Sequence, residues 1–319
     1  MSKSNVKNAY MIMAHNNWKQ LKILIRLLDD ENNDFYIHID KSVKIPDIQD
    51  IKKQARYSDI IFTNRIRVKW GGYGTINASM ILLEEAVKKG YDYYHLMSAS
   101  DLPLKSNEEI NKFLKEHMYD NDSRNRMTNY LSYGLVENEM VRARVSHYNL
   151  LVPLFRTTPK FIGLMFKKFN ALGYHVQKFL HVDRLKKTEM VLYKGSLWYI
   201  ITNECAKFFL NNRGGGKKYF GRMTFSGDEY VLQTLLMNSE LKYTVFNSNN
   251  NGMNGNLYEI DWNNTYGDGS PHLYTIRDKD LLEKSMNLYA RKFDIRVDSK
   301  IVESIVQKHG GKVDINEKE

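Results

Sequence analysis

The sequence predicts an α/β fold in which helices flank a sheet that contains parallel strands. Two apolar runs, residues 8–15 and 34–40, have the composition of strands, and an amphipathic helical pattern fills the short span between them. A strand, helix and strand joined this closely require a parallel pair with a right-handed crossover. The chain of 319 residues shows no internal repeat and no long linker, so we expect one continuous domain.

The first two strands end on polar residues. Residues 8–15 form the continuous apolar run that is typical of a strand buried on both faces, and residues 34–40 follow as its neighbour. The helix between them is expected over residues 18–30. In parallel sheets, ligands bind beyond the carboxyl ends of the strands. His15 and Asp40 stand at those ends, so each is a candidate ligand contact, with a structural hydrogen bond as the alternative.

A third strand, residues 60–63, leads into a glycine-rich loop over residues 65–74. Glycine lets a backbone approach a phosphate closely, but the spacing matches neither a P-loop nor a dinucleotide-binding loop. As a phosphate site the loop is therefore a weak candidate. Thr75 has the position of a helix N-cap, and the helix is expected to end at Gly90 after two lysines.

A fourth strand is expected over residues 92–104, where an apolar run leads into a polar tip. Asp101 stands near its carboxyl end, which makes this carboxylate a further candidate for ligand contact. Beyond the strand, Ser106 and Glu109 have the spacing of a capping box at the start of a helix that extends to Glu116.

Asp120 and Asp122 form an Asp-x-Asp pair in a loop-like stretch beyond that helix. Divalent cations such as Mn²⁺ accept carboxylate oxygens as ligands, so the pair has the chemistry of a metal site. The pair follows a helix rather than a strand, however, and two acids in one loop are common. We therefore expect no metal at this position.

The basic residues predict an anionic partner. The formal net charge is +10, and much of the excess lies between Arg142 and Lys194, in a segment that also contains long apolar runs. Nucleic-acid-binding domains carry docking motifs or place basic and exposed aromatic residues in one compact module. The sequence contains no such module, so we expect no nucleic-acid partner. A basic apolar segment favours an anionic membrane surface or an acceptor site, and the alternative is a solvated helix face.

The C-terminal half contains further predicted elements. Residues 193–202 and 257–262 read as strands, and the chain closes with an amphipathic helix. Residues 213–218, Arg-Gly-Gly-Gly-Lys-Lys, are expected to form a basic loop.

Cysteine usage and the N-terminus bear on the compartment. The single cysteine, Cys205, is expected to be buried on a helix face, and a lone cysteine fits a reducing compartment. The first apolar run is too short for a signal peptide or a membrane span. The expected location is the cytoplasm, with attachment to the inner face of the plasma membrane as an option.

The most informative stretch is residues 224–239, in which an acidic pair precedes an apolar helical pattern. Ser226 has the position of an N-cap, and Ser226-Gly-Asp-Glu229 has the form of a capping box, in which the glutamate bonds back to the cap and does no chemistry. The alternative is that Glu229 is a catalytic base at the start of the helix. The local pattern leaves both interpretations open.

Nine motifs follow one another in order along residues 8–295. They are Ala9-Tyr-Met-Ile-Met-Ala-His15, Phe35-Tyr-Ile-His-Ile-Asp-Lys41, the Trp70 loop, Leu96-Met-Ser-Ala-Ser-Asp-Leu-Pro-Leu104, Lys194-Gly-Ser-Leu-Trp198, Thr224-Phe-Ser-Gly-Asp-Glu229, Ile260-Asp-Trp262, Ser270-Pro-His272 and Ala290-Arg-Lys-Phe-Asp294. In this order and spacing they resemble the core-2/I-branching family, which contains β-1,6-N-acetylglucosaminyltransferases and protein xylosyltransferases.

This resemblance implies a glycosyltransferase-A-like (Rossmann-like) mixed sheet flanked by helices, a UDP-sugar donor and inversion to a β-glycoside. It also implies that Glu229, the glutamate of the Ser-x-Asp-Glu motif, is the general base, and that Lys292 contacts the donor diphosphate. A second cation on the diphosphate is left open among Arg291, His272 and Arg277, in that order. Members that lack a metal-binding Asp-x-Asp use such cations, so we expect no cofactor, with Mn²⁺ as the alternative.

The remaining candidate residues divide between the two substrates. Those on the donor side are His15, Asp40 and Asp101. Those on the acceptor side are Trp198, Trp262, Tyr258 and Asp228, of which Asp228 is expected to be mainly structural. Animal members of the family also carry a membrane anchor and several disulfides, and because we expect neither in this chain, it resembles a bacterial cytoplasmic form.

Together these observations predict one glycosyltransferase domain over residues 1–319. Residues 8–117 form its nucleotide-binding half, residues 120–190 a basic apolar insertion, and residues 190–295 its acceptor and catalytic half. The expected function is transfer of a sugar, N-acetylglucosamine first, to a glycan or lipid-linked glycan in the synthesis of surface polysaccharide. The alternatives are transfer of xylose or another sugar, and an inactive module that binds glycans or a membrane surface.

Overall fold

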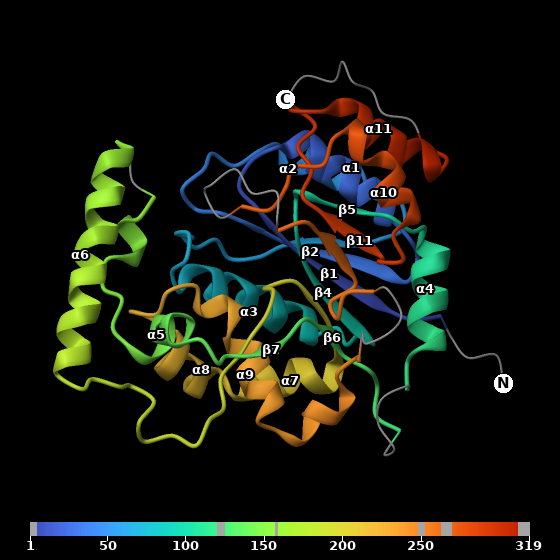
Figure 1. Cartoon of the computed structure of the whole chain (residues 1–319). Coiled ribbons are helices and arrows are strands. Elements are labelled where there is room, and N and C mark those ends of the chain that lie inside the picture. Colours follow the sequence, from blue (N-terminus) through green and yellow to red (C-terminus); the bar gives the residue numbers. More distant parts are fainter. Residues whose placement is uncertain (1–4, 120–124, 157–158, 248–252, 263–269, 312–319) are drawn as a thin grey trace.

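The computed structural model describes residues 5–119, 125–156, 159–247, 253–262 and 270–311, and a six-stranded sheet lies at its centre (Figure 1). Its strand order is β3 (Ile60–Phe62), β2 (Asn33–Ile39), β1 (Asn8–Ala14), β4 (Tyr93–Ser98), β9 (Tyr199–Thr202) and β6 (Tyr130–Leu131). Neighbours from β3 to β4 are parallel, whereas β9 is antiparallel to both β4 and β6. The sheet is therefore mixed, which confirms the expected fold class.

Two smaller sheets use the remaining strands of the described residues. In one, β11 (Tyr289–Arg291) lies between β10 (Tyr258–Ile260) and β5 (Asp101–Pro103), and in the other β7 (Gly134–Leu135) pairs with β8 (Tyr193–Lys194). The strands expected within residues 92–104 and 193–202 are present as β4 and β9, but each stretch also supplies a second, short strand, β5 or β8, to another sheet. Apolar composition predicts an extended segment, but the partner of each strand lies far away in the sequence.

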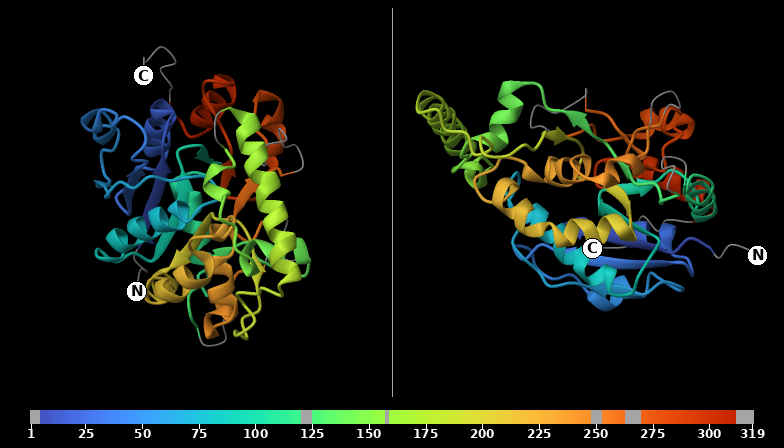
Figure 2. Two further views of the ribbon diagram at one scale, coloured as in Figure 1. Left: turned by 90° about the vertical axis from the view of Figure 1, so that its left-hand side faces the viewer. Right: turned by 90° about the horizontal axis from the view of Figure 1, so that it is seen from below.

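Helices lie on both sides of the main sheet. Figure 1 shows α1 (Trp18–Leu28), α10 (Lys279–Lys284) and α11 (Ser299–Lys308) above the strands and α3 (Gly74–Val87), α7 (Asn203–Asn211), α8 (Arg213–Phe220) and α9 (Val231–Met237) below them. The other helices are α2 (Ile48–Lys52), α4 (Asn107–Glu116), α5 (Glu139–Ser146) and α6 (Lys160–Phe179). Of these, α6 stands at one edge of the molecule, beside α5, as the two turned views also show (Figure 2).

The structure tests three of the expectations about where helices begin. The capping box of Ser106 and Glu109 is present at the start of α4. Thr75 does not cap α3, because the helix already begins at Gly74 and its N-cap, Tyr73, makes no side-chain cap bond. The expected loop at residues 213–218 is wrong as well, since these residues form the first part of α8.

The glycine-rich start of α8 is accommodated by packing against α9. A Cβ atom added to Gly216 would lie 3.1 Å from the Val231 side chain, so glycine permits this close approach. Tertiary packing thus outweighs the low helix propensity of the three glycines.

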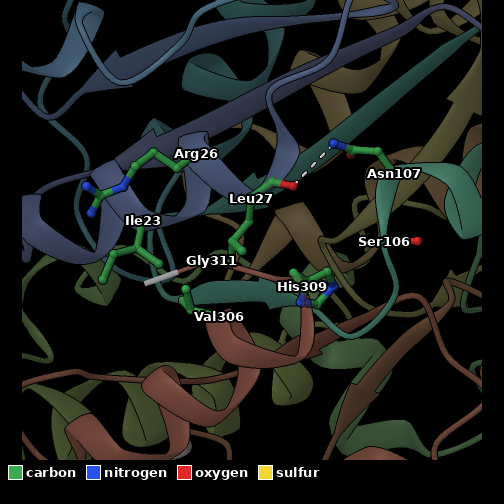
Figure 3. Close-up of a pocket in the computed structure, with 8 residues that line it drawn as sticks. All are labelled: Ile23, Arg26, Leu27, Ser106, Asn107, Val306, His309 and Gly311. Atoms are coloured by element: carbon green, nitrogen blue, oxygen red, sulfur yellow. Dashed lines mark hydrogen bonds between the residues drawn. The ribbon is translucent and has the colours of Figure 1, made fainter. Parts of the chain in front are cut away.

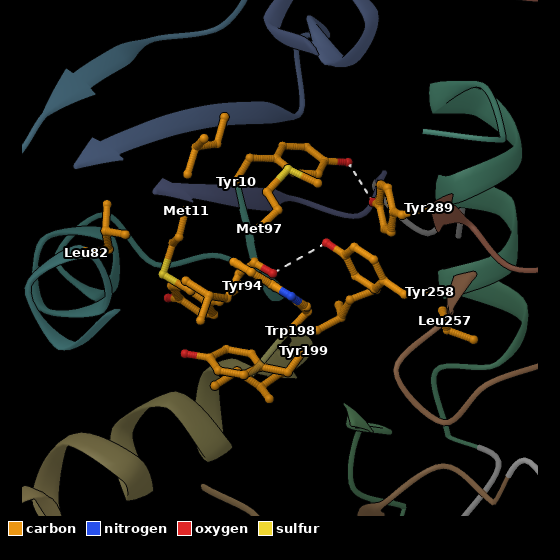
Figure 4. Close-up of a cluster of buried hydrophobic side chains, with 14 of the residues drawn as sticks. Tyr10, Met11, Leu82, Tyr94, Met97, Trp198, Tyr199, Leu257, Tyr258 and Tyr289 are labelled. Atoms are coloured by element: carbon orange, nitrogen blue, oxygen red, sulfur yellow. Dashed lines mark hydrogen bonds between the residues drawn. The ribbon is translucent and has the colours of Figure 1, made fainter. Parts of the chain in front are cut away.

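Aromatic side chains connect the main sheet to the β10-β11-β5 sheet (Figure 4). The Tyr10 and Tyr289 hydroxyls lie 3.3 Å apart, and the Tyr289 hydroxyl lies 3.1 Å from Nδ1 of His95. On its other side, Nε2 of His95 lies 3.1 Å from Oδ1 of Asn8. All four residues are fully buried, and burial lowers the pKa of His95 to about 3, so its imidazole is neutral. The core therefore contains a satisfied polar network that fixes how the two sheets meet.

Candidate active site

A cleft of about 770 Å³ opens at the carboxyl ends of the parallel strands β1, β2 and β4. His15 follows β1, Asp40 follows β2 and Ser98 ends β4, and all three line the cleft. This is the edge at which an α/β sheet binds its ligand. The cleft also receives side chains from the segments around Trp70, Lys194, Glu229 and Lys292.

A second hollow, of about 360 Å³, lies between α1, the start of α4 and the end of α11 (Figure 3). Its lining includes Arg26, Asn107 and His309, and the Asn107 side chain donates to the Leu27 carbonyl at 3.3 Å. It contains none of the residues that the sequence nominated for substrate binding. The large cleft is therefore the candidate active site.

Asp40 is committed to holding the loop that follows β3. Its Oδ1 accepts hydrogen bonds from the backbone and hydroxyl of Ser42 at 2.7 and 2.8 Å, and its Oδ2 accepts from the Val68 backbone at 3.1 Å. The structural hydrogen bonds anticipated for Asp40 are thus present. His15, in contrast, is exposed at the cleft.

The capping-box interpretation of residues 226–229 is wrong. Ser226 lies in the left-handed region with φ 52°, and its side chain makes no cap bond. Its backbone N–H instead donates to the Gly71 carbonyl at 2.8 Å, which joins the acidic segment to the glycine-rich loop. Gly227–Glu229 form the 3₁₀ turn η2, and α9 begins only at Val231. The carboxylate of Glu229 is consequently available for other partners.

Two cations from other segments lie next to Glu229. Its Oε2 is 2.9 Å from Nζ of Lys194 and 3.9 Å from a guanidinium nitrogen of Arg144. The Gly195 backbone donates to the Glu229 carbonyl at 2.8 Å, and a Cβ atom at Gly195 would collide with the Ser132 carbonyl. Residue 195 must therefore be a glycine, because the chain passes this close to Ser132 where it binds the backbone of Glu229. The result is a carboxylate held at the cleft wall by both its backbone and its charge.

Asp228 has a different environment from its neighbour. It lines the cleft, yet its Oδ1 is buried without a hydrogen-bond partner among the described residues. Burial, and after it the negative charge of Glu229, raises the pKa of Asp228 to about 7. Two adjacent carboxyl groups thus have distinct environments, one beside cations and one in a poorly solvated position.

Asp101 does not line the cleft but positions a residue that does. It is fully buried, and its Oδ1 accepts a hydrogen bond from Arg291 at 2.5 Å. Burial raises the pKa of Asp101, while the Arg291 charge acts in the opposite direction. The Arg291 guanidinium also lies 4.3 Å above the ring of Trp198. The expectation that Asp101 contacts the donor directly is therefore wrong, because its carboxylate is buried and forms this ion pair with Arg291.

The candidates for the cationic contact separate clearly. Lys292 and Arg291 both line the cleft. His272 does not, and its Nε2 lies 3.0 Å from an Asp278 carboxylate oxygen. Arg277 is exposed on η4 (Ile276–Asp278), away from the lining. The structure thus brings the first-ranked pair together at the cleft and places His272 and Arg277 outside its lining, where His272 binds Asp278 and Arg277 is exposed.

The acceptor-side candidates also separate. Trp262 is 50% exposed and lines the cleft, whereas Trp198 is 7% exposed and reaches the cleft beside Arg291. Tyr258 is fully buried, and its hydroxyl donates to the Leu96 carbonyl at 3.4 Å (Figure 4). The expectation that Tyr258 contacts an acceptor is wrong, since its position on β10 directs the ring into the core.

The cleft residues that were not nominated from the sequence include three with large side chains, Lys194, Arg156 and Trp70. The Arg156 guanidinium lies 3.9 Å from the centre of the Trp70 ring, and both line the cleft. Lys194 belongs to one of the nine motifs, so its motif was a usable signal. For Arg156 no local pattern distinguished it from the other basic residues of its segment.

The described residues contain no group of three or more His, Cys, Asp or Glu side chains placed to hold a metal ion. Asp120 and Asp122 lie outside the described residues. Within the same residues, no helix combines the length and the apolar character needed to cross a bilayer.

Comparison with known proteins gives one extended family match. The model of the Core-2/I-Branching enzyme family matches residues 8–287. Xylosyltransferase 2 of Homo sapiens is 24% identical over an alignment that covers 93% of this chain and 33% of that protein. Xylosyltransferase 2 of Canis lupus familiaris is 30% identical over 43% of this chain and 16% of that protein. The chain thus spans about a third or less of the length of these relatives.

Comparison with solved structures adds little. Core-mannan synthase A from Aspergillus fumigatus, in a Mn/GDP form, aligns with 75% of this chain and 71% of that chain at 14% identity and a TM-score of 0.28. Mouse xyloside xylosyltransferase 1 aligns with 74% of this chain and 82% of that chain at 7% identity and a TM-score of 0.29. At these scores neither likeness supports an argument about this protein.

Proposed function

Because the chain belongs to the Core-2/I-Branching enzyme family of glycosyltransferases, we propose that it transfers a sugar from a UDP-sugar to a hydroxyl of a glycan acceptor with inversion. The observation that carries the proposal is the position of Glu229, a carboxylate beside Lys194 at the wall of the large cleft, with Arg291 and Lys292 lining the same cleft. One site thus holds a proton acceptor and cations that suit a diphosphate.

The proposed reaction is one in-line displacement. The acceptor oxygen forms a bond to the anomeric carbon while the bond from that carbon to the diphosphate oxygen breaks, and its electron pair leaves with UDP. Glu229 takes the proton of the acceptor hydroxyl, as a general base must, and a base of this kind contributes roughly 10²–10⁴-fold to the rate. Lys194 holds the carboxylate in place before the acceptor arrives.

Cationic side chains are the proposed counter-charge for the departing diphosphate. Lys292 takes the direct contact, and Arg291 supports it from a guanidinium fixed by Asp101 and Trp198. Preorganised charges of this kind stabilise a transition state without the cost of reorientation. We propose on this basis that transfer does not require a metal, and Mn²⁺ is the alternative that the experiment below distinguishes.

The sugar has two candidates. N-acetylglucosamine is the first, as the family resemblance implies. Xylose is the second, and the names of the similar curated proteins, xylosyltransferases from several animals, favour it. For the acceptor, the half-exposed Trp262 offers a flat apolar surface on which a sugar ring packs. A glycan or lipid-linked glycan that serves surface polysaccharide synthesis is the proposed acceptor class.

The proposed compartment is the cytoplasm. Cys205 is the single cysteine, so the chain can form no disulfide within itself, and its side chain is buried. A chain that does not rely on disulfides suits a reducing environment. A fluorescent fusion that remains in the cytosolic fraction after osmotic shock of the host cell would support this location, and release with the periplasm would contradict it.

The test is a panel of UDP-sugars scored for UDP release, with and without excess chelator. We expect one sugar to stand out and the chelator to leave its rate unchanged. The Glu229→Gln variant should lose at least about 100-fold in rate while it still binds UDP, because only the proton acceptor is removed. Glu283→Gln, a change at an exposed α10 residue, is the control. A near wild-type rate for Glu229→Gln would contradict the base assignment, and loss of activity in chelator that Mn²⁺ restores would contradict metal independence.

A further inference from the structure

The outward face of α6 is apolar. Six large side chains at helical spacing, here called the outer stripe, are all exposed: Phe161, Met165, Phe169, Leu172, Val176 and Phe179. At 3.6 residues per turn they lie within one continuous sector along the whole helix. Phe161 and Phe179, at the two ends, are 69% and 81% exposed. Surface helices normally turn such a face toward the core, so α6 is inverted relative to that pattern.

Polar contacts on the opposite side fix this orientation. Asn170 donates to the Asn149 side chain at 3.0 Å. Gln177 binds the backbone of Tyr148 twice, accepting from its N–H at 2.7 Å and donating to its carbonyl at 3.0 Å. Lys178 pairs with Glu139 of α5 at 2.9 Å. Rotation of the helix to bury the outer stripe would break these contacts, so the apolar face is directed outward by the rest of the molecule.

The charge around the stripe is of one sign. Between Glu139 and Asp183 the sequence contains seven basic residues and no acidic residue. Lys168 lies at the edge of the outer stripe, and the exposed Lys160 and Lys167 lie further round the same side of the helix; these three are here called the bordering lysines. An apolar face bordered by lysines matches the interface of a bilayer, where acyl chains lie beneath anionic headgroups.

We propose that α6 binds the surface of an anionic phospholipid bilayer through the outer stripe and its bordering lysines. A second copy of the chain fits this face less well, because pairing two such faces would bring together the bordering lysines of both copies, and α6 itself contains no acidic residue. The helix lies in the plane of the interface rather than across it. Its 20 residues, about 30 Å of helix, supply a long line of contact.

The docked helix would place the cleft close to the membrane. Arg156, which lines the cleft, lies just before α6, and the neighbouring Phe155 ring packs against Phe225 at 5.6 Å, next to the segment that carries Glu229. This part of the inference rests on the proposed function: a transferase held at a bilayer in this way suits an acceptor whose glycan is attached to a lipid.

The test measures co-sedimentation of the full chain with vesicles, in the absence of any sugar substrate. Vesicles contain phosphatidylglycerol and phosphatidylcholine in equal parts, or phosphatidylcholine alone. We expect binding to the first and at least about tenfold weaker binding to the second, with the difference shrinking as salt is raised. The double variant Phe169→Asp with Leu172→Asp should bind anionic vesicles at least about tenfold more weakly. Changing Lys167 and Lys168 to Gln should cost about fivefold for each lysine.

The matched control is the double variant Leu281→Asp with Met286→Asp, which adds the same two charges at side chains that are each 52% exposed. It should bind vesicles like the wild type. Circular dichroism of each variant verifies folding. We expect each variant to fold like the wild type, because all the altered side chains are exposed. Equal binding of the wild type and the stripe variant would overturn the proposal. So would a wild-type dimer in light scattering that the stripe variant converts to a monomer without vesicle binding by either protein, because a second copy would then cover α6. None of these results depends on sugar transfer.

Discussion

At the scale of single residues, the acidic pair shows how the same side-chain type acquires two roles. Glu229 lies beside Lys194 and Arg144, whereas the buried Oδ1 of Asp228 has no partner among the described residues. The sequence pattern predicted a capping box at this point, but Ser226 lies in the left-handed region and its side chain makes no cap bond. The proposed catalytic role of Glu229 stays a prediction, and the alternative role in a capping box is absent.

Lys292→Ala tests the diphosphate contact. Removing the ammonium group should weaken UDP binding by about ten- to a hundredfold, because a hydrogen bond to a charged group contributes about 1.5–3 kcal/mol. Isothermal titration calorimetry with UDP measures the change. Lys300→Ala, at an exposed lysine of α11, is the control and should bind UDP normally. An unchanged affinity for Lys292→Ala would remove this residue from the donor site.

Asp228 should make stability depend on pH. Its folded pKa of about 7 exceeds the unfolded value of about 3.9, so the folded protein keeps a proton that the unfolded chain loses. The resulting stabilisation is complete below about pH 4 and is lost as the pH rises through about 7. Asp228→Asn should therefore be nearly neutral at about pH 4 and stabilising by at least about 1 kcal/mol at about pH 8 in urea unfolding. The same difference at both pH values would contradict this account.

At the scale of elements, the segment that leads into η2 is tied down by one arginine. Arg184 donates from Nη1 to the Val145 carbonyl at 3.1 Å and to the Thr224 hydroxyl at 2.9 Å. Its Nη2 donates to the Tyr219 carbonyl at 3.2 Å. It thereby joins the end of α5, the end of α8 and the approach to Glu229. No periodic pattern predicts these contacts, because the partners of Arg184 lie on three separate segments of the chain.

Arg184→Ala should destabilise the protein by about 2–3 kcal/mol, since several carbonyls lose their donor. Urea unfolding measures the free energy of unfolding, and UDP release measures whether the Glu229 segment also loses its order. Lys187→Ala, three residues further along and exposed, is the control. If both variants unfolded at the same urea concentration, the hydrogen bonds of Arg184 would contribute nothing net.

At the scale of the whole molecule, the cleft is lined by residues at the ends of strands from two sheets, the main sheet and the β10-β11-β5 sheet. Asp101 and Arg291 join β5 to β11, and the Tyr10, Tyr289 and His95 network joins that small sheet to β1 and β4. Both contacts connect segments from opposite ends of the chain. The position of Arg291 and Lys292 relative to the strand ends therefore depends on how the entire chain closes.

Tyr289→Phe tests this connection. The change keeps the ring but leaves the Tyr10 hydroxyl and Nδ1 of His95 without the partner they have now. A buried polar group that loses its partner costs about 1–3 kcal/mol, so the free energy of unfolding should fall by about that amount. Tyr57→Phe removes an exposed hydroxyl and serves as the control, with an expected change within about 0.5 kcal/mol. A neutral Tyr289→Phe would show that the network does not stabilise the fold.

The sequence by itself determined the strand, helix and strand unit of residues 8–40, the burial of Cys205 and the capping box at Ser106, because each follows from periodicity or from neighbours within one turn. Its ordered motifs also identified the family. Only the tertiary structure decided that Lys194 forms an ion pair with Glu229, that Asp101 forms one with Arg291 and that Tyr258 is buried in the core. Those outcomes depend on contacts between residues far apart in the chain, and a local pattern carries no information about which distant partner a side chain will meet.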